Sequence, residues 1–215
     1  MAKYKKLLVA IDGSTSSMQA LGQSFKLSKQ GTLGVSVAPP YTVDLRVDAE
    51  EGIKSLLREP CETALNKASE MAQAAGAEVF GICAMGQPHE RIVDLSESEG
   101  CDLIVVGAKG MLSIEKAFMG DVTAKVIGFS VKDVLVVPDK TELGLDRILL
   151  ATDGSEYSRR ATVRAMDFAA SYGTELLVVS IVEISSEVYS IAPEVVEKKV
   201  GEAGEYLAGI KKQAE

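Results

Sequence analysis

A glycine-rich segment in the middle of the chain carries residue types that could bind phosphate. Leu103 to Val106 is a short, β-branched apolar run that predicts a buried strand, and it ends at Gly107. Gly110 follows after two residues and Gly120 after nine more, where helical spacing begins. Backbone N–H groups left open by small residues at the positive end of a helix can bind phosphate. By itself the pattern also fits glycines that only turn the chain tightly.

Other residue types that could do chemistry are dispersed. The single histidine, His89, stands at an expected helix start, and Ser14 and Ser155 lack a histidine base. Metal-binding residue types are not grouped at ligand spacing. We therefore expect no catalytic residues and no metal site, with weak ATP hydrolysis as the upper limit of activity.

Charge and composition restrict the partners. A net charge of −8 and a pI near 4.9 argue against a nucleic-acid partner, because phosphate contacts need clustered Lys and Arg. No apolar run reaches the length of a membrane span, and the start of the chain does not resemble a signal peptide. We expect a cytoplasmic protein in which Cys61, Cys83 and Cys101 are reduced, with Cys83 packed in the core.

Apolar runs that predict strands alternate with segments that predict helices. Strands are expected at 7–11, 33–38, 78–84, 103–106 and 134–137, and helices at about 16–30, 60–75, 92–99 and 122–129. Residues 41–55 are interpreted as a loop or short helix. This alternation predicts an α/β fold, a doubly wound parallel sheet. Such sheets bind ligands at the carboxyl ends of the strands where the strand order reverses.

The first strand and its turn recur later in the chain. KLLVAIDGS, residues 6–14, reappears as RILLATDGS at 147–155. We predict a complete domain at 1–139, a linker at 140–146 and an incomplete second domain at 147–215. The second copy is expected to run strand, helix (156–172), strand (176–182) and helix (193–213). Counterparts of the third strand, the glycine loop and the closing strand are absent from it.

Residues 3–138 resemble the universal stress protein family. The resemblance rests on the G-x2-G-x9-G loop from Gly107 and on segments in the family's order: VAIDGS at 9–14, GQPHERI at 86–92, EGCDLIVVG at 99–107 and VLVVP at 134–138. It implies a five-stranded sheet of order 3-2-1-4-5, as in the adenine nucleotide alpha hydrolase-like fold. The site would lie between the first and fourth strands.

The resemblance also implies which residues bind the nucleotide. Asp12 would contact the ribose, although Asp-Gly-Ser is also ordinary turn chemistry. The backbone of Val37 would contact adenine, and Val122 and Thr123 would face the phosphates. The ligand would be ATP or AMP, with Mg²⁺ accompanying ATP. The full set of expected nucleotide-binding residues is Ala10, Ile11, Asp12, Val37, Gly107, Lys109, Gly110, Gly120, Asp121, Val122 and Thr123.

Asp121 departs from the family pattern, in which ATP-binding members carry Ser or Thr after the third glycine. A carboxylate at a helix start gains about 0.3–1 kcal/mol from the helix dipole. It would also occupy N–H groups and repel phosphate, a repulsion that Lys109 could partly offset. Two hypotheses follow: a regulatory protein that binds adenine nucleotide, with at most slow hydrolysis, and a dimerising interaction module whose loop is capped by Asp121. An ATP-cleaving enzyme is disfavoured, because Asp12-Gly13-Ser14 replaces the glycine-rich loop that such enzymes carry after the first strand.

The closing strand of the first copy predicts self-association. Val134, Leu135, Val136 and Val137 form an apolar edge, and the second copy never reaches an equivalent strand. Two strands and two helices are also marginal as an independent sheet. We expect a homodimer in which these edges pair across a two-fold axis. The second copies would pack on the neighbouring chain or on their own first copy.

Overall fold

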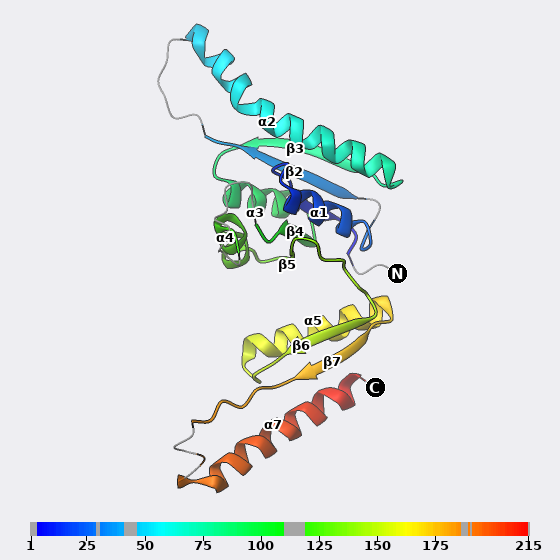
Figure 1. The fold of residues 1–215 in the computed structure, drawn as a ribbon, viewed down its shortest axis with the longest axis vertical. Helices are drawn as coiled ribbons and strands as arrows, with labels where there is room; N and C mark the ends of the chain where they lie inside the picture. The colour runs from blue at the N-terminus through cyan, green and yellow to red at the C-terminus, as the bar shows by residue number, and fades with distance from the viewer. Residues whose placement is uncertain are drawn as a thin grey trace. The chain divides into compact units, whose positions relative to one another are not determined.

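The computed structural model describes residues 4–28, 31–40, 47–109, 119–185, 189 and 191–214, and for residues 47–53 it describes the backbone only. Residue contacts divide the chain into two compact units, and the boundary in the sequence falls between Leu143 and Gly144. Each unit has its own parallel sheet (Figure 1).

The sheet of the first unit has the strand order that the family resemblance implies. Its order is β3-β2-β1-β4-β5, and every pair of neighbouring strands is parallel. Each crossover carries a helix, which allows parallel strands to lie side by side. The strands are β1 (Leu7–Ala10), β2 (Thr32–Ala38), β3 (Val79–Met85), β4 (Leu103–Gly107) and β5 (Asp133–Val137).

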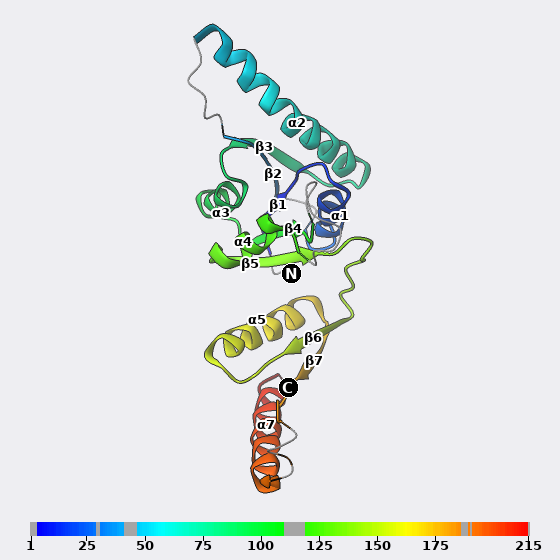
Figure 2. The same ribbon diagram turned by 60° about the vertical axis from the view of Figure 1, so that its left-hand side comes forward.

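Helices cover both faces of this sheet. Figure 2 shows α1 (Thr15–Ser24) and α2 (Val47–Ala74) on one side, and α3 (Pro88–Ser98) and α4 (Asp121–Phe129) on the other. A buried cluster that includes Leu8, Ile104 and Val126 fills the space under α3 and α4. Strands covered on both faces must be continuously apolar, which is why Leu103 to Val106 reads as an unbroken aliphatic run.

Helix α2 is longer than the sequence predicts. Pro60 is expected to start this helix, yet the helix begins at Val47 and continues through Pro60. The proline is exposed, and the helix is held to the sheet by its other side, where Ala64, Ala68 and Ala72 are buried. These small side chains allow α2 to approach the strands closely. Residues 41–46 of the expected loop lie outside the described residues.

The packing of α2 on β3 also corrects the expected state of the cysteines. Cys61 of α2 and Cys83 of β3 form a disulfide, whereas Cys101 is free and buried. The two paired cysteines are 22 residues apart in sequence and have no recognisable spacing motif. The expectation of three reduced cysteines is wrong for this pair, because helix and strand packing brings the two side chains together.

The second unit has a smaller sheet, of two strands. β6 (Arg147–Ala151) and β7 (Glu175–Val179) are parallel, and α5 (Glu156–Tyr172) packs on one face of them. α7 (Pro193–Ala214) contacts the turn after β6, where the Tyr206 and Thr152 hydroxyls lie 3.2 Å apart. Among the described residues, no helix is both long and apolar enough to cross a membrane.

Candidate functional site

The strand order places the carboxyl ends of β1 and β4 side by side. These strands are neighbours in the sheet, and β1 leads to α1 on one face while the chain after β4 reaches α4 on the opposite face. The connections therefore diverge at the carboxyl ends of the two strands, where parallel sheets bind ligands. Ala10, Asp12 and Gly107 lie at these strand ends, as the resemblance implies.

Asp12 follows β1 and organises the turn into α1. Its Oδ1 accepts a hydrogen bond from the Ser14 N–H at 3.0 Å, and Gly13 has a φ of 79°. Ser14 then caps α1 by accepting from the Ser17 N–H at 3.2 Å, and the Asp12 N–H donates to Ser17 Oγ at 3.3 Å. Asp12 is therefore a turn residue, and the turn holds its exposed carboxylate at the carboxyl end of β1.

Gly107 allows α1 to lie against the end of β4. A Cβ at this position would be 2.5 Å from Ser16 Oγ and 2.8 Å from the Ser16 carbonyl carbon. The Lys109 N–H donates to the same Ser16 Oγ at 3.3 Å. This close approach explains the glycine without any ligand. Ser16 did not emerge from the sequence as a site residue, because only this packing shows its role.

The start of α4 is tied to the end of β4. The Gly120 N–H donates to the Ala108 carbonyl at 2.8 Å, and the buried Thr123 hydroxyl donates to the Gly107 carbonyl at 2.8 Å. The Thr123 hydroxyl therefore anchors the helix, and the expectation that Thr123 faces the phosphates stays a prediction. The result still favours anion binding, because the positive end of α4 is fixed beside the strand end.

Asp121 makes a different contact from the predicted cap. Its Oδ2 lies 2.8 Å from Lys125 Nζ, one helical turn along, and its side chain is 77% exposed. Gly120 is the N-cap residue, and no side chain caps it. Among the residues that the structure describes, the carboxylate is therefore paired with a cation of its own helix. That pairing weakens the repulsion expected between Asp121 and a phosphate.

The remaining candidate residues lie near the ends of β1 and β2, at the start of α4 or outside the described chain. Val37 is half-buried near the end of β2, and the Ile11 N–H donates to the Val35 carbonyl at 2.8 Å. Val122 is 37% exposed in the first turn of α4. Gly110, with residues 111–118 of the glycine loop, lies outside the described residues.

The expected dimer residues lie on a strand at the edge of the sheet. Within the described chain, β5 pairs with β4 alone. Val134, Leu135 and Val136 are half-buried, and Val137 is buried. Phe129 and Val131, just before this strand, are 67% and 79% exposed.

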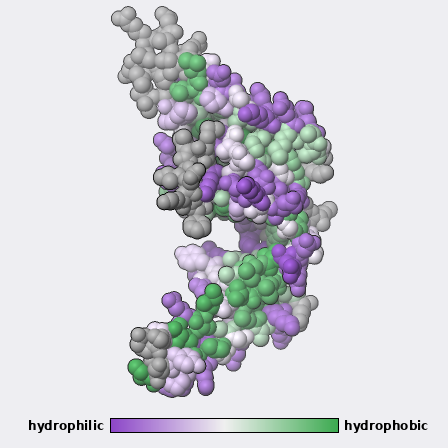
Figure 3. Space-filling model, viewed as in Figure 1, coloured by the Kyte–Doolittle hydropathy of each residue, from purple (hydrophilic) through white to green (hydrophobic). Residues whose placement is uncertain are grey.

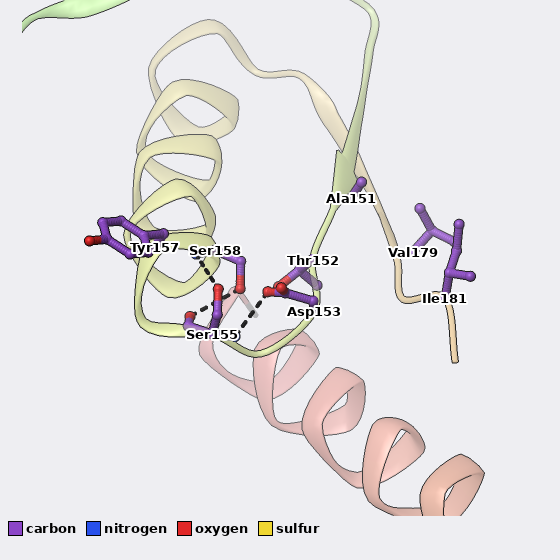
Figure 4. Close-up of a pocket in the computed structure, with 8 residues that line it drawn as sticks. All are labelled: Ala151, Thr152, Asp153, Ser155, Tyr157, Ser158, Val179 and Ile181. Atoms are coloured by element: carbon purple, nitrogen blue, oxygen red, sulfur yellow. Dashed lines mark hydrogen bonds between the residues drawn. The ribbon is translucent and has the colours of Figure 1, made fainter. Parts of the chain in front are cut away.

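The second unit repeats the turn of the first and forms a pocket beside it. Figure 4 shows this pocket, of about 430 Å³, between the end of β6 and the start of α5. Asp153 is the counterpart of Asp12, and its Oδ1 accepts from the Ser155 N–H at 2.9 Å. Hydrogen bonding from Ser158 and Ser155 lowers the pKa of Asp153 to about 2. This pocket is lined by residues of β6, β7, α5 and the segments that follow the two strands, and no described residue of the second unit supplies a counterpart of β4 or α4.

Comparison of the sequence with known proteins identifies one family. The profile described as Universal stress protein family matches residues 3–138 and 144–214. Universal stress protein MJ0531 of Methanocaldococcus jannaschii is 33% identical over 141 residues, which are 62% of this chain and 82% of that protein.

Solved structures agree in fold. A universal stress protein in complex with cAMP is 31% identical with a TM-score of 0.50, covering 65% of this chain and 100% of that one. A universal stress protein from Archaeoglobus fulgidus is 24% identical with a TM-score of 0.66, covering 93% of this chain and 74% of that one. Since the family profile accounts for most of the chain in two segments, the protein belongs to the universal stress protein family.

Proposed function

We propose that the first unit binds an adenine nucleotide at the carboxyl ends of β1 and β4, and that the protein is regulatory, with at most slow hydrolysis. One observation carries the proposal: α4 is fixed by Thr123 and Gly120 to the end of β4, beside the strand whose end carries Asp12. A positive helix end and an exposed carboxylate thus lie at the ends of two neighbouring strands.

The groups at these strand ends suit different parts of a nucleotide. The Asp12 carboxylate can accept hydrogen bonds from ribose hydroxyls, and the backbone of Val37 can contact adenine. The N–H groups at the start of α4 are suited to a phosphate. A related universal stress protein has been solved with cAMP, which supports a phosphate-bearing adenine ligand for this chain. AMP and ATP are the ligands we propose, with Mg²⁺ accompanying ATP.

The Asp121–Lys125 pair should tune the preference among these ligands. Asp121 repels the phosphates, and Lys125 offsets that repulsion through an ion pair of 2.8 Å. Asp121→Ser should raise ATP affinity by about threefold, the size of a screened interaction between charges several ångströms apart. Lys125→Gln should lower it, because Asp121 then has no neutralising partner on α4. AMP should respond less than ATP to both changes, since it carries fewer charges.

Titration calorimetry with the full chain tests the proposal. The wild type is titrated with AMP, ADP, ATP and cAMP, beside Asp12→Asn and the matched control Asp153→Asn. Both substitutions remove one carboxylate from the same type of turn, with accepting distances of 3.0 and 2.9 Å. Losing a charged hydrogen bond to the ribose should weaken binding by about tenfold or more in Asp12→Asn. The control should bind as the wild type does. Wild-type protein that binds none of the four ligands, or equal effects of the two substitutions, would refute the proposal.

We also propose that the β5 edges of two chains pair across a two-fold axis. The exposed Phe129 and Val131 next to this edge support the idea, because apolar edges of this kind are normally covered. The test uses a chain that also carries Leu177→Lys on the exposed sheet face of the second unit, so that this face does not contribute to association. In that chain Val136→Lys should reduce the mass measured by light scattering. An unchanged mass would exclude this edge as the interface.

A further inference from the structure

The two-stranded sheet of the second unit has one apolar face that no described residue covers. Side chains alternate along β6 and β7, so that Leu150 is buried, whereas Leu149 and Leu177 are 66% and 63% exposed. Val179 lies on the same face and is 36% exposed. Figure 3 shows an apolar area over these two strands. We call this surface, formed by Leu149, Ala151, Leu177 and Val179, the open face.

The first unit shows that the same positions form a core when they are covered. The repeat and the strand registers equate Leu149 with Leu8 and Leu177 with Leu33. Leu8 and Leu33 are 0% and 5% exposed in a cluster with side chains of α3, β4 and α4. Within the described residues, the second unit has no elements equivalent to these three. Its open face therefore combines core-type residues with exposure to water.

The arrangement of charge on the open face specifies what can cover it. Arg147 and Glu175 are register partners at the amino ends of β6 and β7, and both are exposed. Residues in register on neighbouring strands point to the same side of the sheet. The face therefore carries three pairs of side-by-side neighbours along its length. They are Arg147 with Glu175, Leu149 with Leu177, and Ala151 with Val179.

This pattern is complementary to itself about a two-fold axis that runs parallel to the strands. Such an axis, placed between two open faces, sets β6 of one chain over β7 of the other at the same height. Arg147 then meets Glu175 of the partner subunit, Leu149 meets Leu177 of the partner subunit, and the small Ala151 meets the larger Val179 of the partner subunit. A two-fold axis perpendicular to the strands would instead set β6 against β6 in opposite directions and leave both charges without an oppositely charged partner on the other subunit.

We propose that the second units of two chains associate through their open faces, as a sandwich of two β6–β7 sheets. Packed sheets lie about 10 Å apart, which suits interdigitated leucine and valine side chains. The contact buries core-type residues that are otherwise in water and forms two identical Arg147–Glu175 ion pairs between subunits. The interface is isologous and separate from the β5 edge.

Charge reversal tests the proposed axis in a way that folding effects cannot imitate. The experiments use the full chain carrying Val136→Lys, so that the β5 edge does not contribute. Sedimentation equilibrium should show a dimer. Arg147→Glu and Glu175→Arg should each weaken dimerisation, by about tenfold or more, because each sets like charges together across the interface. Mixing the two variants should restore association as a heterodimer, since each then offers the charges that the other needs.

A matched pair of apolar positions provides the control. Leu177→Lys introduces a charge on the open face, and Val163→Lys does so on α5, at a side chain of similar exposure (63% and 60%). Leu177→Lys should give monomers, and Val163→Lys should leave the dimer unchanged. A monomeric Val136→Lys protein would overturn the proposal, and so would a mixture of the two charge variants that stays monomeric.

Discussion

Replacing Gly107 with alanine should separate α1 from β4 and damage the nucleotide site together with the fold. The new methyl group would lie 2.5 Å from Ser16 Oγ, and 2.8 and 2.9 Å from the Ser16 carbonyl carbon and oxygen. Two of these three atoms are backbone, so a change of side-chain rotamer cannot relieve the overlap. Ser16 is 4% exposed in the first turn of α1, and therefore the helix itself must shift.

Overpacking of this kind costs about 1–3 kcal/mol. In a unit of this size that loss corresponds to a fall of roughly 3–10 °C in melting temperature. Nucleotide affinity should fall as well, because Ser16 Oγ also accepts from the Lys109 N–H. Gly128→Ala is the matched control, since a Cβ at that helical glycine of α4 meets no heavy atom within 4 Å. This substitution replaces a glycine inside a helix with alanine, and it should raise the free energy of unfolding by about 0.5–1 kcal/mol.

Calorimetry gives the melting temperature of each variant, and hydrogen exchange measured on peptides from β4 shows where protection is lost. Loss of protection should be confined to the first unit. The reasoning is refuted if Gly107→Ala has the melting temperature of the wild type and the same affinity for nucleotide. In that case the contact between α1 and β4 would not be close enough to require glycine.

Three further predictions concern a disulfide, a hydroxyl and a carboxylate. Cys61→Ser, or reduction of the bond to Cys83, should destabilise the first unit by about 3 kcal/mol, which is the chain-entropy value for a loop of 22 residues. Urea unfolding with and without reductant measures this loss of stability. Thr123→Val should cost about 1–3 kcal/mol by removing the donor to a buried carbonyl, whereas Thr123→Ser should cost less, and urea unfolding compares the two. Asp153 should titrate near pH 2 by carboxyl-carbon NMR, and Ser158→Ala should raise that midpoint towards 3.8. Because the folded pKa is lowered, the stabilisation from Asp153 is present above pH 3.8 and is lost as pH falls through about 2.

The sequence alone determined the architecture of the first unit. Continuous aliphatic runs separated by amphipathic segments leave few arrangements other than a parallel sheet with helices on both faces. The strand order, which sets β1 beside β4, was instead implied by the family resemblance, and the structure confirms it. The repeat of KLLVAIDGS as RILLATDGS likewise predicted a second turn of the same kind. Asp12 and Asp153 indeed accept from the N–H two residues later at 3.0 and 2.9 Å. Both features are local in sequence, which is why sequence reasoning reaches them.

Tertiary structure decided the features that depend on distant segments. The Cys61–Cys83 pair and the contact of Gly107 with Ser16 join residues on different elements, and no local pattern encodes their distance. The same limit explains the second unit. Leu8 and Leu149 have nearly the same neighbours in sequence, yet they are 0% and 66% exposed. Burial depends on the elements that pack over a residue, and these are encoded far from the residue itself.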